Sequence, residues 1–275
     1  MKLEDLLSEA KEILKTSGVH NYKFEAEYIL SQILCKDRLS LHLDFNEELP
    51  LEDVFEVLDT VDIRATDKIP VQYIFGQANF YGRNFKVDKN VLIPRPETEL
   101  LVEKVIEISK KFSNPRILEI GSGSGAAAIT VALENQNALV TSVDISSKAI
   151  EISKVNQEKY GSNVVFSVSD LFSNVTGTYD IIFSNPPYIS EEEYKTLSDE
   201  VKKEPKSALI AKDNGLYFYN KIVELASAYK EKDSYLIFEI GSEQGKDVRA
   251  LLSDYKFVSC IKDYNKHDRI IIATN

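Results

Sequence analysis

The sequence predicts an α/β protein with a doubly wound, mostly parallel sheet of seven strands behind a small helical bundle. Three observations support this class. Apolar strand segments alternate with helical segments from residue 114 onward, the first 65 residues show helical periodicity, and a glycine-rich turn follows the first strand of the alternating part. Alternation of this kind favours parallel pairing with helices on both faces of the sheet.

The N-terminal part is expected to be a helical domain, residues 1–69. Apolar residues recur at i, i+3, i+4 and i+7 in segments that begin near Leu3, Phe24 and Leu51. Residues 70–93 are rich in aromatic and β-branched residues, and we expect a β-hairpin linker that turns near residues 81–84. Residues 94–275 then form the α/β domain.

Seven strands and four helices are predicted in the α/β domain after residue 114. The predicted strands are 116–120, 139–144, 164–169, 179–185, 235–240, 257–263 and 268–274. The predicted helices are 126–135, 146–159, 215–230 and 242–255. Because only a short link joins the last two strands, they are expected to pair antiparallel.

Composition narrows the classes of function. The chain has 275 residues, 43% of them hydrophobic, and a formal net charge of −11, which argues against a large nucleic-acid surface. No apolar run approaches the roughly 18–20 residues of a membrane span, and the charged N-terminus lacks the apolar core of a signal peptide. The two cysteines form no CxxC pair, so no metal site is expected. We expect a cytoplasmic monomer that binds neither membrane nor nucleic acid directly.

The glycine-rich turn "GSGSG", residues 121–125, lies between a predicted strand and a predicted helix. Open α/β sheets bind nucleotides at this position, because glycines allow close approach and the helix N-terminus offers free N–H groups. Asp144 ends the next strand, 23 residues after Gly121, where a carboxylate can hold the ribose hydroxyls. The pattern indicates an adenosine-containing cofactor. A ligand-free turn, or a dehydrogenase turn through Gly121, Gly123 and Ala126, remains an alternative.

The segment "NPPY", residues 185–188, ends the fourth strand of the α/β domain. Asn-Pro and Pro-Pro often mark a simple turn. The prolines also fix the backbone and offer no N–H, so the segment presents carbonyl acceptors and the Asn185 amide in a rigid arrangement. Asn185 and Pro186 can accept the two N–H bonds of an –NH2 group on a planar π system, with Tyr188 beside it. Such a clamp would aim the nitrogen at an electrophile.

These motifs together resemble the class I S-adenosylmethionine-dependent methyltransferases that alkylate amide or exocyclic nitrogens. The segments 70–103, 204–222, 238–245 and 268–273 resemble the release factor glutamine N5-methyltransferases (the HemK/PrmC family), over nearly the whole chain. The resemblance implies a Rossmann-like methyltransferase sheet. It also implies methyl transfer from S-adenosyl-L-methionine to the GGQ glutamine of class 1 peptide chain release factors, with S-adenosyl-L-homocysteine as product.

The resemblance also implies roles for individual residues. Asn185, Pro186 and Tyr188 would be catalytic, and the substrate would contact Asn185, Pro186, Pro187, Tyr188 and Arg95. The cofactor would contact Glu119, Gly121, Ser122, Gly123, Ser124, Gly125, Asp144, Asp170, Leu171 and Asn185. Two positions depart from the family pattern: Glu119 stands where many members have Asp, and Leu171 where some have an aromatic residue.

Several alternatives stay open at this point. An N6-adenine DNA or rRNA methyltransferase could use the same clamp, although it needs a means of unstacking a base. A binding protein without catalysis, or a dehydrogenase, would leave the clamp unexplained. Arg95 could belong to a helix start or touch the ligands, and residues 190–209 could be a charged loop or a substrate lid.

Overall fold

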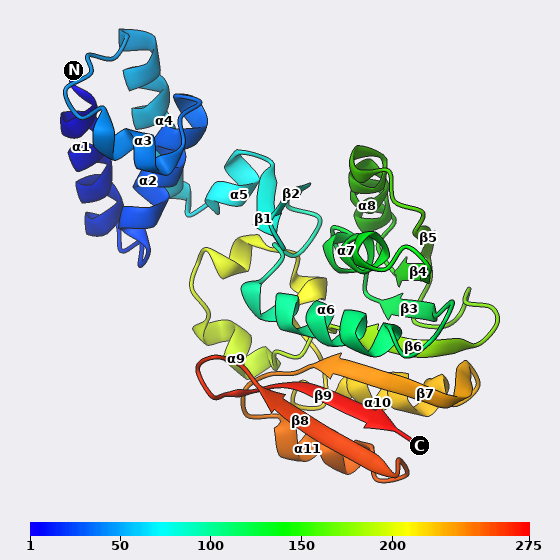
Figure 1. The fold of residues 1–275 in the computed structure, drawn as a ribbon. Coiled ribbons are helices and arrows are strands. Elements are labelled where there is room, and N and C mark those ends of the chain that lie inside the picture. Colours follow the sequence, from blue (N-terminus) through cyan, green and yellow to red (C-terminus); the bar gives the residue numbers. More distant parts are fainter. The chain divides into compact units, whose positions relative to one another are not determined.

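The computed structural model describes residues 1–275, which form two units (Figure 1). The first unit comprises Met1–Gly76 with Ser198–Lys203, and the second comprises Gln77–Leu197 with Glu204–Asn275. The apolar core of the first unit is separate from the two apolar clusters of the second. The functional boundaries at residues 69 and 93 remain a sequence prediction. None of the helices is both long and apolar enough to cross a lipid bilayer.

The first unit is helical. Its elements are α1 (Leu3–Thr16), α2 (Tyr22–Ile33), α3 (Arg38–Leu43), α4 (Leu51–Asp67), α5 (Val71–Ile74) and the 3₁₀ turn η1 (Val201–Lys203). One stripe of α1 is buried, as its periodicity predicts: Leu3, Leu6, Leu7, Ala10 and Leu14. The sequence analysis missed α3, which Asp37 caps by accepting the backbone N–H groups of Leu39 and Ser40. It also missed the helical turn α5 within the expected hairpin linker.

A buried ion cluster lies within the first unit. Arg64 of α4 is 1% exposed, and its Nε donates to Glu25 Oε2 of α2 at 2.6 Å. Its Nη2 donates to Glu200 Oε2 at 2.6 Å. Burying a charge is costly unless it is paired, so the two carboxylates compensate the buried guanidinium. Glu200 thereby fastens the segment Ser198–Lys203 to α2 and α4.

The second unit contains the predicted α/β fold together with the hairpin, and it lacks Ser198–Lys203. Its strands are β1 (Gln77–Phe80), β2 (Arg83–Lys86), β3 (Arg116–Ile120), β4 (Leu139–Asp144), β5 (Val165–Val168), β6 (Tyr179–Ser184), β7 (Lys230–Glu239), β8 (Phe257–Lys262) and β9 (Asp268–Thr274). Its helices are α6 (Pro96–Ser109), α7 (Ala126–Glu134), α8 (Ser147–Tyr160), α9 (Glu191–Thr196), η2 (Lys206–Ala208), α10 (Tyr217–Ala226) and α11 (Gly245–Leu251). The charged segment 190–209 is therefore partly helical.

The seven-stranded sheet has the order β5-β4-β3-β6-β7-β9-β8. The first five strands in this order run parallel, whereas β9 pairs antiparallel with both β7 and β8. Successive side chains of β3 face opposite ways: Ile117 joins the cluster that includes residues of α6, α7 and α8, and Leu118 joins the cluster of α10 and α11. Helices thus cover both faces, as the alternating pattern predicts (Figure 1).

The predicted hairpin is present as β1 and β2. Its turn residues Tyr81 and Gly82 both have positive φ, 51° and 72°, as expected for a two-residue turn that matches strand twist. Asn156 of α8 is fully buried, receives the Lys86 N–H at 2.7 Å and donates to the carbonyls of Lys86 and Ser124 at 2.9 Å each. One amide therefore ties the hairpin to the glycine-rich turn.

Candidate active site

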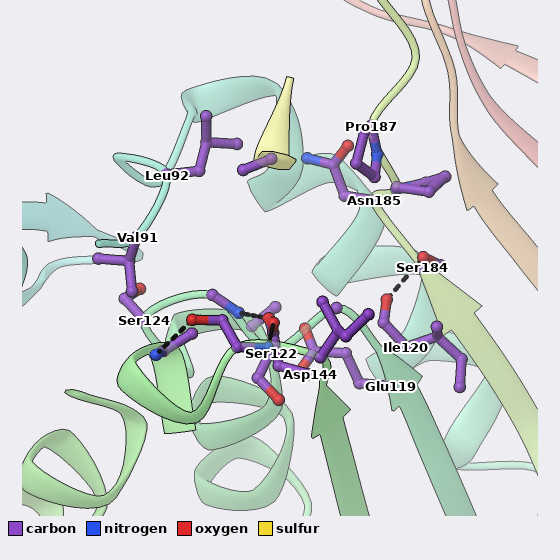
Figure 2. Close-up of a pocket in the computed structure, with 18 of the residues that line it drawn as sticks. Val91, Leu92, Glu119, Ile120, Ser122, Ser124, Asp144, Ser184, Asn185 and Pro187 are labelled. Carbon is purple, nitrogen blue, oxygen red and sulfur yellow. Dashed lines mark hydrogen bonds between the residues drawn. The ribbon is translucent and has the colours of Figure 1, made fainter. Parts of the chain in front are cut away.

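The carboxyl ends of the central strands border a cavity of about 370 Å³ within the second unit (Figure 2). Its walls are the glycine-rich turn, the ends of β4 and β6, residues 90–98 and residues 205–210. All of the residues that the sequence analysis assigned to the site line this cavity, except Gly125 and Tyr188. The volume falls in the range of small-molecule sites, roughly 300–1,000 Å³.

The glycine-rich turn needs its glycines for conformation and space. Gly121, Gly123 and Gly125 have φ angles of 92°, 52° and 79°, a region of backbone conformation that residues with a Cβ rarely adopt. A Cβ at Gly125 would also lie 3.0 Å from Phe166 Cζ. Gly125 is thus a packing residue beneath the turn, at the N-terminus of α7, rather than part of the cavity wall.

Asp144, at the end of β4, organises the turn as well as facing the cavity. Its Oδ2 accepts the Gly123 N–H and its Oδ1 accepts the Ser146 N–H, each at 2.9 Å. Burial raises the pKa of this carboxyl, and the backbone hydrogen bonds oppose the rise. Each oxygen keeps a further acceptor position, so the carboxylate can still receive two hydroxyl groups.

Glu119, on β3, is a second carboxyl in the cavity wall and is 4% exposed. Ser142 Oγ donates to its Oε2, and Ser122 and Ser142 hydroxyls lie 2.6 Å apart. Burial raises the pKa of Glu119 to about 8, and the negative charge of Asp144 adds to the rise. Figure 2 shows Glu119, Ser122 and Asp144 together on one side of the cavity.

The first three residues of the NPPY segment, 185–187, form another side of the cavity (Figure 2). Its entry is fixed by Ser184, whose hydroxyl donates to the Ile120 carbonyl at 2.6 Å. Asn185 Nδ2 donates to Thr98 Oγ1 of α6 at 3.0 Å. This bond uses the amide nitrogen and leaves the Asn185 side-chain oxygen as an acceptor. Pro186 and Pro187 also line the cavity.

Tyr188 is placed differently from the other members of the clamp. It does not line the cavity and packs against the apolar cluster of α10 and α11. Its backbone carbonyl accepts from Gln244 Nε2 at 3.1 Å, and burial raises the pKa of its phenol to about 12. In this arrangement Tyr188 anchors the segment. Stacking against a substrate stays a prediction.

Arg95 lies at the rim and is paired with a residue that the sequence analysis did not assign to the site. Its guanidinium donates to Glu204 Oε1, and Glu204 Oε2 accepts the Ile93 N–H at 3.1 Å. The Glu204 side chain is buried, so it fastens the segment after residue 203 to the loop before α6. A separation of 109 residues between Arg95 and Glu204 gives no local signal for this pair.

Comparison with known protein families identifies the class of the protein. Residues 96–215 match the family model "Methyltransferase small domain", and residues 5–76 match the "PrmC N-terminal domain". The sheet, the glycine-rich turn and the first match define the class: the protein is a methyltransferase.

Curated relatives narrow the class to a family. A release factor glutamine methyltransferase of Fusobacterium nucleatum is 43% identical over 98% of this chain and 78% of its own length. One of Bacillus anthracis is 38% identical over 99% of both chains, and one of Bacillus subtilis is 39% identical over 90% of both. The chain belongs to the release factor glutamine methyltransferase family.

Solved structures share the fold. A methyltransferase from Pyrococcus furiosus superposes with a TM-score of 0.53 at 21% identity, covering 71% of this chain and 90% of that one. The T. thermophilus 16S rRNA N2 G1207 methyltransferase, solved with AdoMet and guanosine, gives 0.52 at 16% identity, covering 72% and 49%. At these identities the likeness concerns the fold alone.

Proposed function

We propose that this protein transfers the methyl group of S-adenosyl-L-methionine to the side-chain amide nitrogen (N5) of the GGQ glutamine in class 1 peptide chain release factors. The cofactor is converted to S-adenosyl-L-homocysteine. One observation carries the proposal: in a chain of this family, the Asn185–Pro186 acceptors and the Asp144 glycine turn line the same cavity.

The cofactor half of the site has suitable donors and acceptors. Asp144 offers two acceptor positions for the ribose hydroxyls, and the turn 121–125 allows close approach of the methionine part. Asp170 and Leu171, after β5, line the cavity where the adenine would lie, and Leu171 supplies apolar contact. Asp144 places negative charge beside a ligand that carries an ammonium and a sulfonium group, and Glu119, whose pKa burial raises to about 8, adds negative charge when it ionises.

The substrate half suits a primary amide. Asn185 Oδ1 and the Pro186 carbonyl each accept one N–H of the glutamine side chain. Pro186 and Pro187 hold both acceptors rigid and add no competing donor. Arg95 and Pro187 at the rim are the further residues that we assign to substrate contact.

The chemistry follows from this orientation. When bound, S-adenosyl-L-methionine supplies an electrophilic methyl carbon on a positively charged sulfur. Asn185 and Pro186 direct the amide nitrogen at that carbon, so that the N–C bond forms as the S–C bond breaks. The same acceptors stabilise the positive charge that develops on nitrogen, until one N–H proton is lost to solvent. Orientation is the main contribution of the clamp, worth several kcal/mol when aligned.

An N6-adenine methyltransferase is the less favoured reading. Adenine also presents a planar –NH2 group, so the clamp alone does not distinguish the two acceptors. Curated relatives at 34–43% identity over nearly the whole chain are named for the glutamine of release factors. The net charge of −11 also disfavours a nucleic-acid substrate.

The direct test uses radiolabelled S-adenosyl-L-methionine with the full-length protein and three substrates: a class 1 release factor, its GGQ variant with Gln replaced by Ala, and duplex DNA. We expect label on the intact release factor alone. The mass of the GGQ peptide should increase by one CH2 unit, because a methyl group replaces one hydrogen. Label on DNA, or equal label on the Gln→Ala factor, would contradict the proposal.

A further inference from the structure

We infer that Gln244 is a positioning residue that holds the exit of the NPPY segment, and that Gly215 leaves the space which this contact needs. The inference rests on the proposed function, because the NPPY segment carries the two acceptors for the glutamine amide. Gln244 belongs to the segment 238–245, to which the proposed chemistry gives no role. Neither Gln244 nor Gly215 lines the cavity, so each acts on the reaction only through the clamp.

The exit of the NPPY segment is the end that its own sequence leaves free. Pro186 and Pro187 have fixed φ angles, and each proline restricts the residue before it. The entry is also held, because Ser184 ends β6 and is hydrogen-bonded to β3 through its hydroxyl. No proline restricts Tyr188 or the residue after it. Because the two prolines are stiff, a displacement of the Tyr188 backbone is transmitted to the Pro186 carbonyl rather than absorbed, and the exit needs a tertiary contact.

Gln244 supplies this contact, and its hydrogen bonds fix which end of its amide faces Tyr188. Its Nε2 donates to the Tyr188 carbonyl at 3.1 Å, across 56 residues of sequence. Its Oε1 accepts the Gly241 N–H at 3.1 Å and the Tyr219 hydroxyl at 3.4 Å. A backbone N–H only donates and a carbonyl only accepts, so the opposite orientation of the amide would lose both backbone bonds. The –NH2 group of Gln244 therefore faces the clamp.

Two glycines from separate turns make room for the Gln244 side chain. A Cβ at Gly215, which precedes α10, would lie 2.1 Å from the Tyr188 oxygen and 2.6 Å from Gln244 Nε2. A Cβ at Gly241, which follows β7, would lie 2.9 Å from Gln244 Oε1. Real Cβ atoms essentially never come this close to another atom, so a larger residue at either position would displace the amide or the carbonyl. The turns before α10 and after β7 thus converge on one peptide group of the clamp.

Gln244→Glu tests the hydrogen bond to Tyr188. The substitution keeps the size of the side chain and an oxygen for the Gly241 N–H, but it replaces the donor by a second acceptor that faces a carbonyl. We expect kcat at saturating S-adenosyl-L-methionine and release factor to fall at least about 10-fold. A wild-type kcat would overturn the inference.

Calorimetry with S-adenosyl-L-homocysteine separates positioning from loss of folded protein. An unfolded fraction would lower the number of binding sites together with kcat. A positioning defect lowers kcat for each binding site, so we expect the Kd and the stoichiometry of Gln244→Glu to match the wild type. A fall in stoichiometry that accounts for the whole fall in kcat would overturn the inference.

Gly215→Ala displaces the same carbonyl by a different route, and Gly161→Ala is its matched control. Both glycines have positive φ, 84° and 62°, so alanine is strained at either position. Nothing lies within 4 Å of a Cβ at Gly161, whereas the Cβ at Gly215 meets the Tyr188 oxygen. A misplacement of about 1 Å costs on the order of 100-fold in rate, and we expect a fall of this size in Gly215→Ala alone. Equal kcat values in the two variants would overturn the inference, even if Gln244→Glu does not fold.

The wild-type protein separates failure of the proposed function from failure of the inference. If it does not methylate the release factor at all, the proposed function fails and the inference falls with it. If it methylates the release factor while Gln244→Glu and Gly215→Ala keep its kcat, the function stands and the positioning role is wrong.

Discussion

Replacement of Asp144 by Ala removes the carboxylate that we assign to the ribose hydroxyls. Hydrogen bonds to a charged group contribute about 1.5–3 kcal/mol each. Asp144 is half-buried and has two acceptor positions left, so we take the lower end and expect a loss of about 3 kcal/mol of binding free energy. That loss corresponds to an increase of about 100-fold in the Kd of S-adenosyl-L-methionine.

Isothermal titration calorimetry on the full-length protein measures this effect. Asp180→Ala is a matched control, because Asp180 also accepts a backbone N–H, from Arg116 at 2.8 Å, at the opposite ends of β6 and β3. The cofactor Kd of Asp144→Asn should lie between those of the wild type and Asp144→Ala. The asparagine keeps only one oxygen, and its –NH2 group would face the Gly123 N–H. An Asp144→Ala variant that binds the cofactor as tightly as Asp180→Ala would refute the ribose assignment.

Further predictions concern catalysis, packing and buried charge. Asn185→Ala should lower kcat at least about 100-fold with the cofactor Kd unchanged, and wild-type turnover would contradict the clamp. Gly125→Ala, at φ 79° and with a Cβ 3.0 Å from a phenylalanine ring, should lower the free energy of unfolding in urea by about 1–3 kcal/mol; an unchanged value would contradict this packing. Arg64→Met should lower the free energy of unfolding by about 3–5 kcal/mol, because it leaves Glu25 buried and unpaired. Adding Glu25→Leu should recover most of this loss. A double variant that is no more stable than Arg64→Met would argue against the pairing. Glu119 has a folded-state pKa of about 8, above its ordinary 4.5, so its neutral form stabilises the fold below about pH 4.5 and that contribution is lost as pH rises through about 8. The free energy of unfolding should therefore fall less in Glu119→Gln than in the wild type when pH rises from 5 to 9, and the two losses should differ by at most about 5 kcal/mol. Urea unfolding without cofactor measures both losses. Parallel pH profiles would show that Glu119 does not titrate in this range.

The fold was readable from the sequence wherever one periodicity persists. Each of the seven strands of the α/β sheet overlaps its expected range, and the antiparallel end follows from the short link after β8. Short helices were harder to predict from the sequence. The helix α3 depends on the local Asp37 cap, and α11 covers Gly245–Leu251 rather than 242–255. There Gln244 is engaged with the Gly241 N–H and the Tyr188 carbonyl, which leaves the first residues of the expected helix in a turn.

The site was readable where chemistry is concentrated in a short motif. The turn 121–125 and the segment 185–188 each combine unusual residues within five positions, so their geometry can be argued locally. Thr98 and Glu204 carry no such signal. Thr98 pairs with Asn185 across 87 residues and Glu204 with Ile93 across 111, and only the folded sheet edge brings them together.

The charges around the cavity favour a cationic ligand. Glu119 and Asp144 have raised pKa values chiefly because they are buried, and Arg95, the one basic residue in the cavity wall, is already paired with Glu204. A sulfonium and an ammonium group bound here would supply the missing positive charge and draw the Glu119 pKa downward. By linkage, the same interaction makes binding of S-adenosyl-L-methionine tighter as pH rises toward about 8. Methyl transfer removes the sulfonium charge, so we expect S-adenosyl-L-homocysteine to lose this part of the electrostatic attraction while it keeps the ammonium group.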